Sequence, residues 1–223
     1  MNIDYTQIVY SDEQKENFPS ELEGNPVFIS LDSRRINGTH GKHYDSEDDA
    51  IKDFLLREFD SKQLGTYYNW FISKDGKLYH LTPDNKAGHS SVFALYSSRM
   101  SMSLPTICPQ HKVDVTNLSN IPDKKIISIC TELSDFENDA PISDNQEYVL
   151  KNLISYYIKN QEVKPKDVIC RSHITRREIE KEILGHKAYK DNITGLVLLT
   201  SYALMISRNE SEITLNKERD LEI

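Results

Sequence analysis

Residues 68–89, which read YNWFISKDGKLYHLTPDNKAGH, say more about the fold of this chain than any other stretch. Two short β-prone runs, 67–72 and 77–81, lie on either side of Lys74, Asp75 and Gly76. Asp-Gly between two such runs is a strong signal for a β-hairpin, because both residues tolerate the backbone of a tight turn. The stretch therefore predicts two paired strands.

The apolar runs on either side of this hairpin predict the rest of a sheet and its helices. Short runs rich in β-branched residues predict strands at 26–31, 126–133 and 167–171. Apolar residues at helical spacing predict helices after the N-cap Ser46 and at 144–159. A capping box of Thr175 and Glu178, with Gly185 at the other end, predicts a helix at 175–184, and a further helix is expected at 193–207. Strands mixed with helices predict a single α/β domain, with a central mixed β-sheet flanked by helices.

The chain divides into a main domain and two polar ends. We expect a polar N-terminal lead at residues 1–25, a main domain at 26–208 and a charged C-terminal tail at 209–223. Residues 88–125 show little periodicity and read as a long insertion, which is a candidate surface for a protein partner. The helix at 175–184 reads as a second insertion.

Composition excludes several classes of function. The chain has 223 residues and a formal net charge of -8, which disfavours a nucleic-acid partner. Its three cysteines are too scattered for a disulfide framework, and residues 1–20 lack the apolar core of a signal peptide. The longest apolar run, 193–206, is too short to span a membrane. We expect a protein made in the cytoplasm, which would reach a cell wall only by lysis or a non-Sec route.

The stretch 68–89 resembles a segment of the zinc-dependent N-acetylmuramoyl-L-alanine amidases, which include phage endolysins and animal peptidoglycan-recognition proteins. That segment reads strand, Asp-Gly, strand, Pro-Asp-Asn-Lys and Ala-x-His. Residues 126–133 resemble the family's Ile-Gly-Ile-Glu strand, and 163–173 (VKPKDVICRSH) resemble its Pro-x-x-x-Ile-Val-Gly-His segment. The resemblance covers roughly residues 26 to 195. It implies the amidase and peptidoglycan-recognition fold, with peptidoglycan or a muropeptide as the partner.

The resemblance also implies a zinc ion held by three side chains and a water. His173 matches the second ligand, and Asp191 is a candidate for the third. The position of the first ligand reads Ser30, whose neutral hydroxyl is a poor zinc ligand. His40 or His43, in the loop after the first strand, are candidate replacements.

Other positions carry assisting roles in the family. Three residues fall where the family has catalytic side chains, and three more are candidate substrate contacts: Tyr68, Glu132 and Lys187 for catalysis, and His89, Trp70 and Asn69 for substrate. Each also has a plainer interpretation. Tyr68 suits the core or a groove wall, Glu132 suits an ion pair, and a histidine after a strand is often only hydrogen-bonded.

Three functions stay open from the sequence. The first is a zinc amidase that cleaves between the muramoyl lactyl group and L-alanine. The second is a pseudoenzyme that binds peptidoglycan fragments without hydrolysis. The third is an amidase fold used for protein binding through residues 88–125, since fold alone does not fix function.

Overall fold

A computed structural model describes the sheet, its helices and the segments next to them. The described residues are 1–16, 18, 25–26, 28–34, 44–60, 68–83, 86, 126–132, 143–161, 163–164, 168–171, 196–198 and 212–223. Their elements are β1 (Asn2–Val9), α1 (Asp12–Lys15), β2 (Phe28–Arg34), α2 (Glu47–Asp60), β3 (Trp70–Ile72), β4 (Leu78–His80), β5 (Ile126–Glu132), α4 (Asp144–Asn160), β6 (Val168–Arg171), β7 (Leu196–Leu198) and β8 (Thr214–Glu222).

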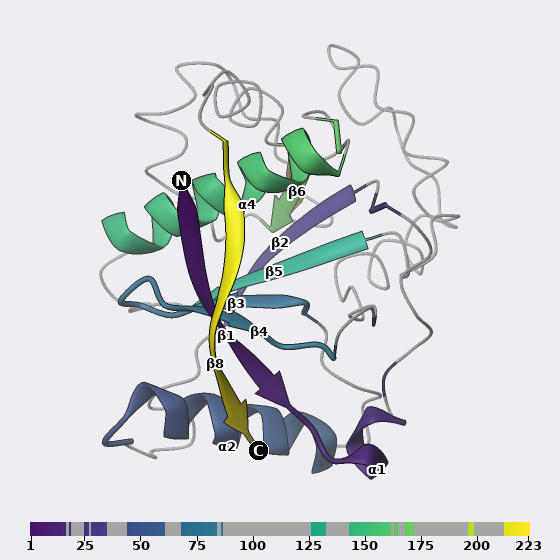
Figure 1. Cartoon of the computed structure of the whole chain (residues 1–223), viewed down its shortest axis with the longest axis vertical. Helices are drawn as coiled ribbons and strands as arrows, with labels where there is room; N and C mark the ends of the chain where they lie inside the picture. The colour runs from purple at the N-terminus through teal and green to yellow at the C-terminus, as the bar shows by residue number, and fades with distance from the viewer. Residues whose placement is uncertain are drawn as a thin grey trace.

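The described strands form one eight-stranded mixed sheet in the order β7-β6-β2-β5-β3-β4-β1-β8. Strands β6, β2, β5 and β3 run parallel, and β4 returns antiparallel to β3. Helix α4 lies above the sheet and α2 below it (Figure 1). The prediction of an α/β domain with a mixed sheet between helices is confirmed.

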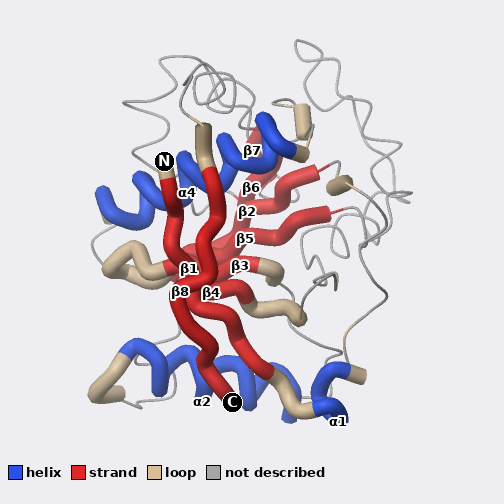
Figure 2. The backbone as a smooth tube through the Cα atoms, in the orientation of Figure 1, coloured by secondary structure: helices blue, strands red, loops and turns tan. Residues whose placement is uncertain are grey.

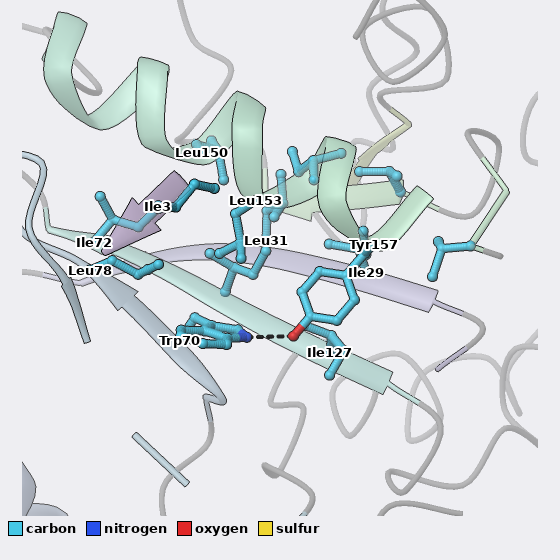
Figure 3. Packing of buried hydrophobic residues seen from close by; sticks show 14 of the residues in the cluster. Ile3, Ile29, Leu31, Trp70, Ile72, Leu78, Ile127, Leu150, Leu153 and Tyr157 are labelled. Carbon is cyan, nitrogen blue, oxygen red and sulfur yellow. Dashed lines mark hydrogen bonds between the residues drawn. The ribbon is translucent and has the colours of Figure 1, made fainter. Parts of the chain in front are cut away.

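Alternation along the strands gives the sheet two apolar faces. On β3, Trp70 and Ile72 join the cluster beneath α4, whereas Phe71 joins the cluster that contains α2. Leu153 and Tyr157 of α4 belong to the first cluster, as Figure 3 shows. Both clusters are built from side chains that are almost fully buried, which is why the hydrophobic runs of the sequence predicted these strands.

The hairpin predicted by Asp-Gly is present and tightly closed. The backbone N–H of Ser73 donates to Lys77 O at 3.0 Å, and Gly76 N donates to Ser73 O at 2.9 Å. Gly76 has φ +82°, which a glycine adopts without steric cost. A Cβ on Gly76 would lie 2.9 Å from Cβ of Asn145, so the turn also packs closely against the start of α4.

The two ends of the chain, to which the sequence assigned no strand, form β1 and β8. They lie side by side and parallel at one edge of the sheet (Figure 2), and β1 also pairs with β4. The sequence of β1 shows no clear alternation of polar and apolar residues, because side chains on both of its faces are buried: Ile3 packs under α4, and Ile8 packs on the α2 side. Buried strands lack a clean alternation of polar and apolar residues.

A β-bulge in β8 explains why its sequence looks like a charged tail. Tyr5 pairs with Lys217 but Thr6 pairs with Arg219, so Glu218 is the extra residue. One added residue reverses the faces that follow it. Leu215 therefore packs with the α4 cluster, and Leu221, six positions later, is buried in the α2 cluster.

The predicted helix at 193–207 is wrong for residues 196–198. We predicted a helix at 193–207, but Leu196, Val197 and Leu198 form β7, antiparallel to β6. A short apolar run fits a buried strand as well as a buried helix, and only pairing with a neighbouring strand decides between them. The predicted helix at 175–184 and the predicted insertion at 88–125 lie outside the described residues.

Candidate functional site

Four of the predicted site residues are described, and the structure places them at two ends of the sheet. Tyr68, Asn69 and Trp70 lie where β3 begins, and Glu132 is the last residue of β5. Asn69 is level with Ser128, four residues before Glu132 on the parallel strand β5. At about 3.3 Å per residue, the backbones of Asn69 and Glu132 are about 13 Å apart along the strands. Tyr68 and Glu132 are therefore not neighbours.

Trp70 is a core residue with its polar atom satisfied. It is 3% exposed, and its indole N–H donates to the hydroxyl of Tyr157 at 2.6 Å (Figure 3). Its ring stacks on His80 with centroids 4.2 Å apart, and Tyr5 meets it edge-on at 5.3 Å. Burial raises the pKa of Tyr157, so this hydroxyl stays neutral. Packing alone accounts for Trp70 in this position.

Tyr68 is also buried. It is 3% exposed and belongs to the apolar cluster on the α2 side of the sheet. This placement agrees with the plainer of its two interpretations. A catalytic role for Tyr68 stays a prediction.

Asn69 links three segments of chain. Its backbone N–H donates to Ser128 O at 2.8 Å, and its Oδ1 accepts from Ser128 N at 2.9 Å. Its backbone O accepts from Leu81 N at 2.7 Å. Its Nδ2 donates to Thr82 Oγ1 at 3.5 Å and to Lys86 O at 3.4 Å. Asn69 thus holds the segment that leads to His89.

A polar cluster beside Asn69 was not predicted from the sequence. Gln7 Nε2 donates to Ile8 O and Thr82 O, each at 3.0 Å, which fixes the orientation of its amide. Its Oε1 therefore faces Nδ1 of His80 at 2.7 Å, and His80 donates from Nδ1. His80 Nε2 lies 3.3 Å from Thr82 Oγ1. Gln7 and His80 are 73 residues apart, so no local pattern announces their contact.

Glu132 lies at the other end of the strands from Asn69, where it holds the turn of the hairpin in place. It is 3% exposed, and its Oε2 accepts from Lys74 N at 3.0 Å. Its backbone O accepts from Nε2 of Gln146 at 2.8 Å, and the same Nε2 donates to Ile72 O at 3.2 Å. Ser143 Oγ, the N-cap of α4, donates to Lys74 O at 2.7 Å. These contacts give Glu132 a structural role.

A separate charged cluster ties β8 to α2. Both carboxylate oxygens of Asp48 accept from the guanidinium of Arg219, at 2.7 and 2.8 Å. Tyr79 also donates to Asp48, at 2.9 Å. The guanidinium of Arg219 holds the pKa of Asp48 below its usual value, whereas burial and the adjacent carboxylate raise the pKa of Tyr79. Asp48 lies in the first turn of α2, where the helix dipole also favours a negative charge.

The candidate zinc site falls largely outside the described part of the chain. Six of the predicted residues lie there: His40, His43, His89, His173, Lys187 and Asp191. Ser30 is described as backbone of β2, paired with Ser128 on β5 and Ile169 on β6. Zinc in proteins is held by Cys, His, Asp or Glu, so Ser30 does not fit the first-ligand position.

The part of the chain that the structure describes contains neither a metal-binding group nor a membrane-spanning helix. Among the described residues, no three His, Cys, Asp or Glu side chains gather as they would around a metal ion. None of the helices described is long and apolar enough to span a membrane. A protein partner at residues 88–125 stays a prediction, because that segment is outside the described residues.

Comparison with solved structures finds amidases and peptidoglycan-recognition proteins. The N-acetylmuramoyl-L-alanine amidase LysC from Clostridium intestinale is 16% identical, covering 77% of this chain and 86% of its own, with a TM-score of 0.40. PGRP-Hd from Alvinella pompejana is 16% identical, covering 75% and 84%, with a TM-score of 0.44. Wild-type PGRP-LB from Drosophila is 12% identical, covering 92% and 95%, with a TM-score of 0.40.

No family model and no curated protein matches the chain. The solved structures bear the names of the superfamily that the motifs of residues 68–89 resemble. Their identities of 12–16% and TM-scores of 0.40–0.44 give no weight to any single role of this chain. Its function has to be inferred from its own residues.

Proposed function

We propose that this chain binds peptidoglycan or muropeptides as an amidase-like protein. The supporting observation is the construction of residues 68–83 and Lys86, the described part of the stretch that resembles the amidases. Its hairpin lies in the middle of the sheet, and Asn69 holds Lys86 three residues before His89. His89 falls at the family's Ala-x-His, which lines the substrate groove in proteins of that kind. An anchored segment of this sort suits a binding groove.

The charge of the chain shapes how such binding would work. Peptide stems of peptidoglycan carry carboxylates, and the chain has a net charge of -8, so long-range attraction is not the driving force. Local hydrogen bonds and apolar contacts would supply the affinity. Binding that persists at about 0.5 M salt is therefore expected, since short-range contacts are screened much less than exposed charges.

Hydrolysis is the second candidate, because it is the activity that the resemblance implies. A zinc ion would be held by His173, Asp191 and one of His40 or His43. When bound, zinc lowers the pKa of a water and polarises the scissile carbonyl. Ser30, at the family's first-ligand position, would not be among these ligands, because a neutral hydroxyl is a poor zinc ligand.

Two assisting residues of the resemblance do not fit a single zinc ion. Tyr68 and Glu132 lie at opposite ends of β3 and β5, and the Glu132 carboxylate already accepts from Lys74 N. If hydrolysis occurs, one zinc ion would not be served by both side chains. Lys187, the third candidate, stays a prediction.

Three measurements on the untagged protein test these functions in order. Cosedimentation with purified peptidoglycan at 0.1 and 0.5 M salt should carry the protein into the pellet at both, and its absence at 0.1 M would reject the proposal. Elemental mass spectrometry without added metal then asks whether zinc is bound near one equivalent. An amidase assay of wild type and His173→Ala follows. Release of L-alanine peptides by wild type alone supports hydrolysis, and equal release by both proteins would sink it.

A further inference from the structure

We infer that β8 opens from the sheet as a separate strap, and that the ion pair between Arg219 and Asp48 is the latch that keeps it closed. β8 is the last strand at one end of the described sheet, where β1 is its neighbour. In the closed position, β8 covers the outer backbone edge of β1. The side chains that hold it there are few.

The middle of β8 contributes little to the core. Residues 216–220 are all exposed, and four of these five are charged. Charged side chains and a bulge suit an edge strand, because they discourage pairing with further strands. The same side chains bury little apolar surface, so they add little hydrophobic stabilisation to the pairing with β1.

The apolar contacts of the strap lie toward its two ends. Leu215 packs against the cluster beneath α4, and Leu221 is buried in the cluster that contains α2. Just before the strand, Ile213 is buried, and its backbone O accepts from Nδ2 of Asn160 at 3.1 Å. Ile213 therefore fixes the start of the strap, and the residues after it form the part that can open.

Arg219 joins the middle of the strap to α2. Its guanidinium donates to both carboxylate oxygens of Asp48, at 2.7 and 2.8 Å. The bulge makes this pair possible, because it places Arg219 instead of Glu218 opposite Thr6. On a regular strand, Glu218 would stand there and meet the acidic first turn of α2.

The other polar side chains in the middle of the strap bind only β8 itself or β1. Lys217 Nζ donates to Asp220 Oδ1 at 3.2 Å within β8, and Asn216 Nδ2 donates to Asp4 Oδ1 of β1 at 3.0 Å. Within the described part of the chain, residues 216–220 are tied to α2 by Arg219 alone. Without the ion pair, the strap keeps its backbone ladder and its end contacts.

Hydrogen exchange of the whole chain, at urea concentrations below the unfolding transition, measures the opening. The Ser128 amide donates to Oδ1 of Asn69 at 2.9 Å in the middle of the sheet, so it reports the opening of the whole sheet. The amides of β8 that pair with β1 should exchange at least about tenfold faster than Ser128 once intrinsic rates are divided out. They should share one rate and depend less on urea, because opening a strap exposes less surface than unfolding.

Three variants test the latch. Arg219→Met removes the ion pair and should speed exchange across β8 by about threefold to fivefold, as expected for a partly exposed pair. Lys217→Met is the matched control, because it removes the same charge from the same strand and breaks only the bond to Asp220. It should change exchange by less than about 1.5-fold. Asp48→Asn breaks the latch from α2 and should match Arg219→Met.

Each outcome supports or overturns one part of the inference. Equal protection and equal urea dependence of β8 and Ser128 would show that β8 opens only with the whole sheet, and would overturn the strap. Protection that rises steadily from Ile223 back to Leu215 would show fraying of the chain end, which also overturns it. If Arg219→Met and Lys217→Met exchange alike, the ion pair is not the latch.

Discussion

Gln146→Glu is the sharpest test of how the sheet is fastened to α4. Gln146 is fully buried, and its Nε2 donates to Ile72 O at 3.2 Å and to Glu132 O at 2.8 Å. Its Oε1 accepts from the N-cap Ser143 at 2.8 Å. Glutamate has the same shape and keeps the capping box, but it replaces two N–H donors by an oxygen that faces two carbonyl oxygens.

The size of the effect should depend on pH. An ionised carboxylate that faces two carbonyl oxygens in the core is strongly disfavoured. The variant therefore folds with this carboxyl group protonated, and the pKa of the group in the folded state is raised. Below its unfolded pKa of about 4.3, the variant loses one hydrogen bond, about 1 kcal/mol. Above that pKa, each pH unit adds up to about 1.4 kcal/mol until the folded-state pKa is reached. The loss at pH 7 is thus expected to exceed about 3 kcal/mol.

Urea unfolding at pH 4.5 and pH 7.5 measures this difference, with wild type as the reference at each pH. Gln14→Glu is the matched control, because Gln14 holds the same capping-box position in α1 but at the surface. It should change the free energy of unfolding by less than about 0.5 kcal/mol at either pH. A Gln146→Glu penalty that is the same at both pH values would refute the reasoning.

Three further changes test other contacts. Gly76→Ala should cost about 2 kcal/mol or more in urea unfolding, from its positive φ and its 2.9 Å approach to Asn145, and a neutral result would contradict that packing. Arg219 lowers the pKa of Asp48, so this pair stabilises the fold above about pH 4 and its contribution is lost as the pH falls through the folded-state pKa. Asp48→Asn should therefore make the decrease of Tm below pH 4 less steep than in wild type. An equally steep decrease would contradict a stabilising contribution of the Asp48–Arg219 pair. Deleting Glu218 should cost less than about 1 kcal/mol in thermal unfolding, because a regular strand then keeps Leu215 and Leu221 on the same opposite faces as the bulge does; a loss of about 2 kcal/mol or more would exclude the bulge.

Much of the fold could be predicted because its signals are local. Asp75-Gly76 announced the hairpin, and the N-cap Ser46 placed the start of α2 within a residue. The predicted strand at 126–133 and helix at 144–159 differ from β5 and α4 by one residue each. In each of these segments, the residues that determine the secondary structure lie close together, within a single turn, helix or strand.

The segments that were missed depend on distant partners. Polar Gln7 fits a buried strand only because His80 and Thr82 satisfy it, and the regular spacing of Leu215 and Leu221 hides a change of face at the bulge. The same limit applies to the site. The resemblance identified the stretch around Asn69, but the hydrogen bonds of this side chain to Ser128 N and Lys86 O join residues too far apart in the chain for a local pattern to predict them.

The pairing of β1 with β8 also has a consequence for synthesis. Asn2 and Thr214 are 212 residues apart in the chain yet in contact. At about 5–20 residues per second, a ribosome would make β8 roughly 10–40 s after β1. Through that interval β1 has at most β4 beside it, and its other edge stays open to strands of neighbouring chains. Closing the longer loop costs only about 1 kcal/mol more than closing the 73-residue loop to His80, so the hazard for this edge is one of timing more than of stability.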